Sequence, residues 1–548
     1  MTETIEETQP ATAANTAGAT VADAVAEELT ALGVDRVFGV PGGEVLSLID
    51  ALRRHGIQFA VCRHEANAGI AAAVYGKLRG TTGVALATLG PGAANLMLPL
   101  TSSRLDLEPL LAISAATPDT WPPERTHQKL PLLEAYGPVT KLSGALTPFN
   151  CRALVRAAAA ASVAGPAGPT FLTLAADSAV MTAEDRSVAA PAGDGAGAVG
   201  SPAEAAERLR SLLADAKRPI VVVGAGTRSA TAPALRAWLE SWQLPVAVTP
   251  KVKGMVDETS LAFVGVVGGM AMDALMREAL ASSDLIVGFG LDPTEIDGAW
   301  HTELPMAWAL ESAWATGVVP CSGLIAADHG ELLRELGHEA PCTWSETFEG
   351  TREARADTYR NHTARAGRIS PVAVVRTLAG TMPPETIVVT DVGSHKYLLG
   401  QFWPSREPDT FFMSNGLSGM GYGLPAALAA KLARPESPVL AVVGDGGFSM
   451  NSQELETAKR LGASFVTVVL ADSSYSLIQI GQQNRGLQRY GVDFDPIDSV
   501  KTAEACGVAG VRVESERELA DAVAASLAHG APLVVEVPID VEDYRGII

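Results

Sequence analysis

The sequence predicts an α/β fold with three doubly wound parallel-sheet domains, and three observations lead to this prediction. The chain has 548 residues, which is too long for a single hydrophobic core. Runs of β-branched apolar residues alternate with Ala- and Leu-rich stretches of helical spacing, the pattern typical of βαβ units. Two linker-like stretches, 189–202 and 345–368, divide this alternation into three blocks.

The domain boundaries follow from these linkers and from the amino-terminal composition. The first stretch is rich in Gly, Pro and Ala, whereas the second is polar and favours a surface helix followed by a connection. The acidic, small-residue amino terminus predicts a disordered tail. The expected units are the tail 1–19, an N-terminal domain 20–188, a central domain 200–345 and a C-terminal domain 369–548.

Composition excludes several classes of function. The net charge of −21 argues against nucleic acids and anionic membrane surfaces as partners. Five scattered cysteines without a CxxC pair indicate buried free thiols in a reducing cytosol. The amino terminus lacks a basic and an apolar segment, so we expect no secretion signal and a cytoplasmic protein.

The first and third blocks share an internal pattern of strand, glycine turn, helix and strand. The stretch 83–100 contains GPG at 90–92, and the stretch 438–455 contains GDG at 444–446 in the equivalent place. We therefore predict two related α/β domains on either side of a different one.

The GDG turn is expected to lie at the end of a buried strand. Its glycines, Gly444, Gly446 and Gly447, allow positive φ and a close approach of the backbone. The following helix is predicted to begin near Asn451 or Ser452, which are both good N-caps.

Two acids frame this βαβ unit, because Asp445 lies in the turn and Asp472 follows the next apolar strand. Both are expected at the carboxyl edge of the sheet, where open α/β sheets bind ligands. Glycine-turn amides favour phosphate, and a hard cation such as Mg²⁺ would join phosphate to the carboxylates. The pattern alone leaves open an ordinary turn with solvated acids.

The same residues carry a resemblance to a known family. GDG followed by Asp472 resembles the thiamin diphosphate signature, although Ala471-Asp472 stands where the family usually has two Asn residues. The motifs that resemble acetolactate synthases, above all the FAD-free catabolic type, are VFGVPGG, RHEANAGIAAAVYGKLRG, TLGPGAAN, THQ, GPVTK, VTDVGSHK and SNGLSGMGYGLPAALAA. The resemblance implies a pyruvate oxidase/acetolactate synthase-like fold with pyrimidine-binding, central and diphosphate-binding domains.

The resemblance also implies catalytic residues. Glu65 matches the carboxyl group that hydrogen-bonds N1′ of the aminopyrimidine and so promotes deprotonation of the cofactor. Without the resemblance, Glu65 would be interpreted as an acid stabilised by the dipole of a helix at its amino terminus. His127 and Gln128 match the His-Gln pair of the FAD-free enzymes, in which Gln reaches the substrate side. Asn95 is expected to support its loop rather than to take part in chemistry.

The implied cofactors are thiamin diphosphate and Mg²⁺. Met420 matches the bulky residue that bends the cofactor, although methionine is more often a core filler. The implied metal ligands are Asp445, Asp472 and the backbone carbonyl of Ser474. The implied cofactor-binding residues are Gly393, Ser394, His395, Ser418, Gly419, Met420, Gly444, Asp445, Gly446, Gly447, Asp472, Ser474, Tyr475 and Ser476.

Two positions of the expected substrate pocket depart from the family. Gly481 stands where anabolic enzymes carry Trp and catabolic ones Gln, and Glu44 follows PGG where the family often has Ala or Lys. Gly481 leaves room and removes a polar anchor, and a negative charge at Glu44 would disfavour a carboxylate, so an acceptor that is larger or less acidic than pyruvate stays an alternative. The pocket residues implied by the resemblance are Gly42, Gly43, Glu44, Leu477 and Gly481.

The sequence therefore predicts a carboligase that decarboxylates a 2-oxo acid, pyruvate in the first instance, and adds the two-carbon unit to a second carbonyl, as acetolactate synthases do. Three alternatives stay open: another acceptor, as in carboxyethylarginine synthase; a simple 2-oxo acid decarboxylase; and a catalytically silent cofactor-binding homologue. The segment 288–300 replaces an Arg-containing FAD segment, so we predict no FAD. The family's shared active sites imply a homodimer or homotetramer.

Overall fold

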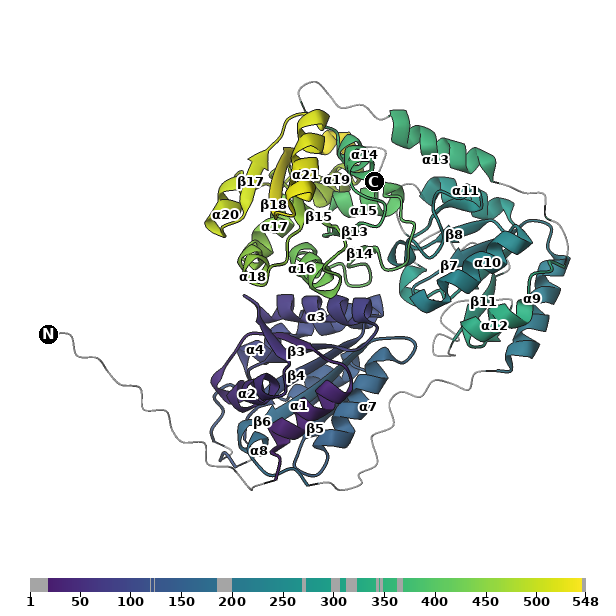
Figure 1. Cartoon of the computed structure of the whole chain (residues 1–548). Helices are drawn as coiled ribbons and strands as arrows, with labels where there is room; N and C mark the ends of the chain where they lie inside the picture. Colours follow the sequence, from purple (N-terminus) through teal and green to yellow (C-terminus); the bar gives the residue numbers. More distant parts are fainter. Residues whose placement is uncertain are drawn as a thin grey trace.

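The fold consists of three α/β domains, each built on a six-stranded sheet in which all the pairs are parallel. Figure 1 shows the N-terminal and C-terminal domains stacked on each other, with the central domain beside them. The computed structural model describes residues 18–118, 120–122, 124–184, 200–268, 273–296, 306–311, 323–341, 344, 348–361 and 368–544.

The N-terminal sheet has the order β2-β1-β3-β4-β6-β5. Its strands are β1 (Arg36–Gly39), β2 (Gln58–Val61), β3 (Gly83–Ala87), β4 (Leu110–Ala116), β5 (Leu142–Leu146) and β6 (Pro169–Ala175). Its helices are α1 (Val21–Ala31), α2 (Leu46–Arg54), α3 (Glu65–Arg79), α4 (Pro91–Asn95), α5 (Met97–Asp106), α6 (Leu132–Tyr136), α7 (Cys151–Val163) and α8 (Ala176–Ala179). The GPG turn lies directly after β3, at the carboxyl edge.

The C-terminal sheet repeats this strand order as β14-β13-β15-β16-β18-β17. The predicted relation between the first and third blocks is thus confirmed, since the GDG turn follows β15 as GPG follows β3. The strands are β13 (Ile387–Thr390), β14 (Phe411–Met413), β15 (Val439–Gly444), β16 (Val466–Ala471), β17 (Ala509–Arg512) and β18 (Leu533–Pro538). The helices are α14 (Pro371–Thr381), α15 (Ser394–Phe402), α16 (Gly423–Ala433), α17 (Asp445–Asn451), α18 (Glu454–Arg460), α19 (Ser476–Asn484), α20 (Ser499–Ala505) and α21 (Glu516–His529).

The central sheet has a different order, β12-β11-β10-β7-β8-β9. Its strands are β7 (Pro219–Val223), β8 (Val246–Val248), β9 (Phe263–Val266), β10 (Leu285–Phe289), β11 (Met306–Leu310) and β12 (Gly323–Ala326). Its helices are α9 (Pro202–Asp215), α10 (Ala232–Trp242), α11 (Asp273–Ser282) and α12 (His329–Leu336). The surface helix expected within 345–368 is α13 (Glu349–Asn361), whereas most of the segments 1–19 and 189–202 lies outside the described residues.

One hydrophobic core joins the N-terminal and C-terminal domains. The helices α3 and α16 pack against each other, and Ala71 and Val74 of α3 share one buried apolar cluster with Ala427 and Leu428 of α16. The small side chains let the two helices approach closely, as ridges fit into grooves between packed helices. The carboxyl edges of both sheets are therefore held in a fixed relation within one chain (Figure 1).

Two further sequence expectations concern thiols and membranes. Cys62 and Cys151 are buried free thiols, and Cys506 is a half-buried one, while Cys321 and Cys342 lie outside the described residues. No helix within the described part of the chain is long and apolar enough to cross a lipid bilayer.

Candidate active site

A cavity of about 230 Å³ opens at the carboxyl ends of β13, β15 and β16. After β13 the chain forms β14 on one side of it and then returns to form β15 on its other side. The cavity therefore lies at a topological switch point, between β13 and β15. The residues that line it are Val392, Gly393, Ser394, His395, Ser418, Met420, Gly444, Asp445, Gly446, Gly447, Leu470, Asp472, Ser474, Tyr475, Ser476, Leu477, Ile478, Ile539 and Tyr544.

The glycine turn differs from the sequence prediction in two ways. The helix predicted to begin near Asn451 or Ser452 is α18, which begins two residues later at Glu454 and has Gln453 rather than either of them as its N-cap. Before it lies a helix that the sequence did not predict, α17, which begins at Asp445 itself. Gly444 has a φ of −81°, and neither of the other two glycines is in the left-handed region. The turn needs glycine for close packing: a Cβ on Gly447 would lie 2.6 Å from Oδ2 of Asp391.

Asp445 organises the turn through its carboxylate. Its Oδ1 accepts a hydrogen bond from the amide of Gly446 at 2.9 Å, and its Oδ2 accepts from the amides of Asp472 and Ser473 at 3.1 and 2.7 Å. Burial raises the pKa of Asp445 above its ordinary value, although these amide hydrogen bonds oppose the shift. The acid therefore joins the ends of β15 and β16 in one rigid unit.

Asp472 lies close enough to Asp445 for the two charges to repel each other. Burial and, after it, the charge of Asp445 raise the pKa of Asp472 to about 7. Two carboxylates held together in a largely buried place favour a cation between them, and Mg²⁺ takes such oxygen ligands together with phosphate oxygens. Among the described residues there is no group of three or more His, Cys, Asp or Glu side chains that could hold a metal by themselves.

The opposite wall of the cavity is formed by the start of α15. Ser394 and Ser476 are joined by a hydrogen bond between their hydroxyl groups at 2.9 Å. Burial lowers the pKa of His395 to about 4, so its ring is neutral at pH 7. The buried Nε2 atom of His395 has no hydrogen-bond partner. Buried polar atoms without partners are rare, and the ring's other nitrogen is bonded to the backbone of Asp391. The negative charge of a diphosphate would favour the protonated ring, whose Nε2–H could then donate to a phosphate oxygen.

Met420 lies in a loop that buried side chains hold from both sides. Asp391 accepts hydrogen bonds from the amides of Gly421 at 2.9 Å and Tyr422 at 3.3 Å. Asp106, in the N-terminal domain, accepts from the amides of Asn415 and Gly416. Burial raises the pKa of Asp391 to about 6. Met420 lines the cavity, and the loop cannot move without breaking these bonds.

Two neighbouring residues complete this loop. Ser418 has a φ of +53°, lines the cavity, and accepts a hydrogen bond from Nζ of Lys396 at 2.8 Å. Gly419 does not line the cavity: it faces the N-terminal domain, where a Cβ would lie 3.2 Å from Cδ1 of Leu98. Neither Asp391 nor Lys396 was predicted from the sequence as a site residue, although both stand in the VTDVGSHK motif.

Lys396 offers a test of this arrangement. Burial lowers its pKa from 10.5 to about 8, so between these pH values the unfolded chain binds more protons than the folded one. Stability is therefore expected to rise with pH across this window, by up to roughly 3 kcal/mol, and the rise should be absent in Lys396→Met. Melting curves from pH 8 to 10 measure the difference. The exposed Lys129→Met variant serves as control, and parallel curves for wild type and Lys396→Met would contradict the prediction.

Glu65 begins α3 at the carboxyl edge of the N-terminal sheet, as the sequence predicts. Its side chain is buried, with 8% of the residue exposed, and Oε2 accepts a hydrogen bond from Nδ2 of Asn95 at 2.9 Å. Its Oε1 faces the GPG turn, where a Cβ on Gly92 would lie 3.1 Å away. Asn95 thus contacts the carboxyl group itself, a role that its place in a loop motif did not reveal.

The other N-terminal site residues gather around the same edge. Gln128 has a φ of +57° and packs on the GPG turn, since a Cβ added to Gly90 would lie 2.8 Å from the Cβ of Gln128. His127, in contrast, is exposed. Glu44 accepts a hydrogen bond from Thr88 at 2.7 Å. The loop glycines differ: Gly42 packs against the Thr88 side chain, and Gly43 has open space around it.

The structure does not bring all the expected site residues together within one chain. Neither Glu65 nor Gln128 lines the C-terminal cavity. In α19, Leu477 lines the cavity, but Gly481 lies beyond it, and a Cβ there would meet nothing within 4 Å. The two clusters are linked by Glu454 of α18, which accepts hydrogen bonds from the Arg63 amide and from Nδ2 of Asn67.

Comparison with known proteins decides the family. Three family models of thiamine pyrophosphate enzymes match the chain, namely the N-terminal TPP binding domain over residues 19–131, the central domain over 206–309 and the C-terminal TPP binding domain over 391–537. An acetolactate synthase of Bacillus subtilis is 30% identical over 547 residues, covering 95% of this chain and 93% of its own length. The chain belongs to the thiamine pyrophosphate enzyme family. It is a thiamine pyrophosphate-dependent enzyme with the three α/β domains of that family.

Other relatives within the family carry related names. A catabolic acetolactate synthase of Raoultella terrigena is 29% identical and covers 95% of both chains. The large subunit of acetolactate synthase isozyme 2 of Escherichia coli is also 29% identical, with 94% of this chain and 95% of its own covered. The resemblance to acetolactate synthases seen in the motifs is therefore confirmed over nearly the whole chain.

Proposed function

We propose that this enzyme decarboxylates pyruvate and adds the resulting two-carbon unit to a second carbonyl, with Mg²⁺ and thiamin diphosphate as cofactors. The observation that carries the proposal is the cavity where Asp445 and Asp472 face the unpartnered Nε2 of His395. The acids, with the Ser474 carbonyl, would hold Mg²⁺, and His395, once the ring is protonated beside the diphosphate, would donate to it from Nε2. The relatives named acetolactate synthases support the reaction type.

The remaining steps belong to residues of this chain. When bound, thiamin diphosphate supplies the carbon nucleophile and the electron sink for decarboxylation. Met420 would press on the bound cofactor from the fixed loop. Glu65, buried beside Asn95, would hold and return a proton at N1′ of the aminopyrimidine.

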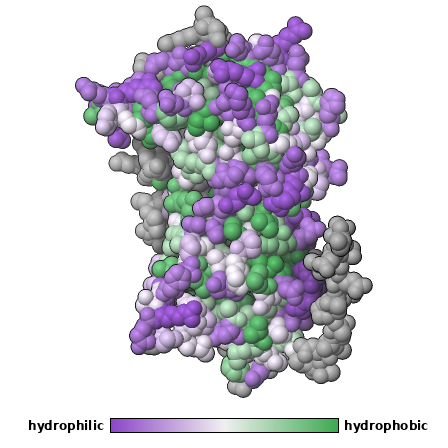
Figure 2. Space-filling view, turned by 90° about the vertical axis from the view of Figure 1, so that its left-hand side faces the viewer, coloured by the Kyte–Doolittle hydropathy of each residue, from purple (hydrophilic) through white to green (hydrophobic). Residues whose placement is uncertain are grey.

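We further propose a homodimer in which Glu65 of one subunit completes the cavity of the other. Its support is that Glu65 does not line the cavity of its own chain. Large apolar side chains are exposed around that cavity, as a second copy would require. Figure 2 shows apolar patches interrupting the polar surface of the face that lies to the left in Figure 1. Among the exposed apolar side chains, Tyr475 and Ile478 line the cavity itself, Met450 lies on α17, and Leu487 and Tyr490 follow α19.

A second candidate function is carboligation to a larger acceptor. Gly481 favours it, because open space surrounds this position, and Glu44 adds a negative charge at the expected pocket. A bulky acceptor would fit where related enzymes carry a large side chain.

The products of labelled pyruvate distinguish these candidates. With pyruvate, Mg²⁺ and thiamin diphosphate, we expect labelled CO₂ and 2-acetolactate, identified by mass spectrometry. Adding a panel of aldehydes and 2-oxo acids should leave acetolactate dominant, and a large acceptor that outcompetes pyruvate would favour the second candidate. Acetaldehyde as the sole product would show a simple decarboxylase, and no CO₂ release would contradict pyruvate as the donor.

A further inference from the structure

The central domain has its own switch point, between β7 and β10. The chain leaves β7 toward β8 on one side, and later places β10 on the other. In open α/β sheets, ligands bind in the crevice at such a point, and a glycine turn there favours phosphate groups. Here β7 is followed by Gly224-Ala225-Gly226, a pattern that on sequence grounds invites a dinucleotide.

The carboxylate of Glu295 fills this crevice. Glu295 follows β10, and only 2% of it is exposed. Its Oε2 accepts hydrogen bonds from the amides of Ala225 at 2.8 Å and Asp292 at 3.1 Å, and Thr249 donates to its Oε1. A Cβ on Gly224 would lie 2.6 Å from that Oε2 atom. The carboxylate thus lies where a glycine turn would hold a phosphate.

The other amides of the turn are also occupied. The amide of Gly224 donates to the carbonyl of Phe289 at 2.9 Å, and that of Gly226 donates to Gly290 at 2.7 Å. The amide of Thr227 closes the turn onto Gly224 at 3.0 Å. No amide from Gly224 to Thr227 is left for a ligand, so the turn has no donor to offer a diphosphate.

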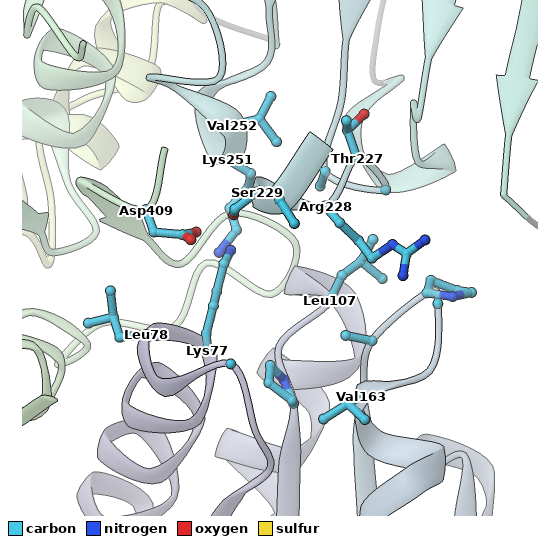
Figure 3. Close-up of a pocket in the computed structure, with 18 of the residues that line it drawn as sticks. Lys77, Leu78, Leu107, Val163, Thr227, Arg228, Ser229, Lys251, Val252 and Asp409 are labelled. Carbon is cyan, nitrogen blue, oxygen red and sulfur yellow. The ribbon is translucent and has the colours of Figure 1, made fainter. Parts of the chain in front are cut away.

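The space beside the turn does not replace these donors. A cavity of about 530 Å³ borders its outer side at the junction of the three domains, and Figure 3 shows Arg228 and Lys251 among its lining residues. Arg228 is paired with Glu311 at 2.9 Å and Asp328 at 2.8 Å. Lys251 is paired with Glu108 at 2.9 Å. Acids of the protein therefore already balance these two cations.

We propose that Glu295 is an internal occupant of the anion position at the central switch point. The native domain then holds neither FAD nor another nucleotide diphosphate there, and removing the side chain frees the Ala225 and Asp292 amides and the Thr249 hydroxyl for a phosphate group. The proposal is independent of the reaction proposed above, since it concerns another domain and another ligand. In this domain the glycine turn is still present, and the carboxylate of Glu295 rather than the loss of the glycines keeps a phosphate out.

The test uses the enzyme saturated with thiamin diphosphate and Mg²⁺, so that added nucleotide cannot enter the C-terminal cavity. ADP and FAD are titrated by calorimetry into wild type, Glu295→Ala and Glu295→Gln. We expect wild type to bind ADP with a dissociation constant above about 1 mM, and Glu295→Ala to bind it at least about tenfold more tightly. Glu295→Gln should behave like wild type, because its amide oxygen still accepts the Ala225 N–H.

Two results would overturn the proposal. One is micromolar binding of FAD or ADP by wild type, or flavin absorbance in the purified protein. The other is a Glu295→Ala variant that melts like wild type and yet gains no affinity for ADP. If that variant does not fold, Glu295→Ser, with a polar group that fills part of the space, takes its place in the titration.

Discussion

Replacing Glu65 by Gln is expected to lower kcat by roughly 100- to 10,000-fold, the range for loss of a positioned proton donor or acceptor, and to leave cofactor affinity nearly unchanged. Gln has the same shape and can still accept the hydrogen bond from Asn95. It cannot take up or release a proton, so the step that needs one at the aminopyrimidine is lost. The change in kcat without a change in binding separates a chemical role from a structural one.

The measurement is the rate of CO₂ release from pyruvate, together with the dissociation constant of thiamin diphosphate from calorimetry. Glu134→Gln is the matched control, because it removes the same charge at an exposed position of the same domain. Turnover within a few-fold of wild type in Glu65→Gln would show that another group handles the proton.

Asp445→Asn is expected to weaken binding of thiamin diphosphate with Mg²⁺ by at least about 100-fold. The carboxylate accepts amides of Gly446, Asp472 and Ser473, and an Asn side chain would turn an NH₂ group toward some of these donors. Without these bonds the turn would have to be re-ordered on binding the cofactor, and about 3 kcal/mol, the upper end of the range for one hydrogen bond to a charged group, corresponds to roughly 100-fold in affinity. A proposed metal ligand is lost as well.

Calorimetric titration of the cofactor at fixed Mg²⁺ measures this loss, and the exposed Asp495→Asn variant controls for the change in net charge. Cofactor affinity like that of wild type in Asp445→Asn would exclude Asp445 from the cofactor site. Asp472 would then have to hold the cation without it.

The two variants together test the shared active site. In a mixture of Glu65→Gln and Asp445→Asn chains, a mixed dimer with shared sites has one doubly altered site and one intact site. Random reassembly should then restore roughly a quarter of wild-type activity, given two equivalent sites in a twofold dimer. If each chain used its own Glu65 and Asp445, mixing would restore nothing.

Local pattern was enough to predict the framework of the site. Apolar periodicity depends on neighbouring residues and can be seen in the sequence. It was enough to predict the strand before the GDG turn, the start of α3 at Glu65 and the repeat of one domain in another. Gly444, Gly446 and Gly447 do not adopt the positive φ that glycine allows. Gly447 is needed because it has no side chain, not because of a left-handed backbone. Asp391 fills the space that a Cβ on Gly447 would take, and it comes from another strand end.

Contacts between distant residues could not be predicted in the same way. Asn95 reaches Glu65, Lys396 reaches Ser418, and Glu295 reaches a glycine turn from another strand. Each pair is separated by a loop or by whole elements, and its partners meet only once the sheets and helices have packed. A single sequence shows which donors and acceptors are present, but not which of them come close together in the fold.

The packing of α3 against α16 has a consequence for synthesis on the ribosome. The apolar face of α3 is complete early, yet its partner in the shared core is made more than 300 residues later. At about 5–20 residues per second, that face waits roughly 20–70 s for its cover. During this interval the nascent chain exposes the apolar face of α3, which can aggregate. The yield of folded protein should therefore depend on chaperones that cover this face and on the rate of translation through the central domain.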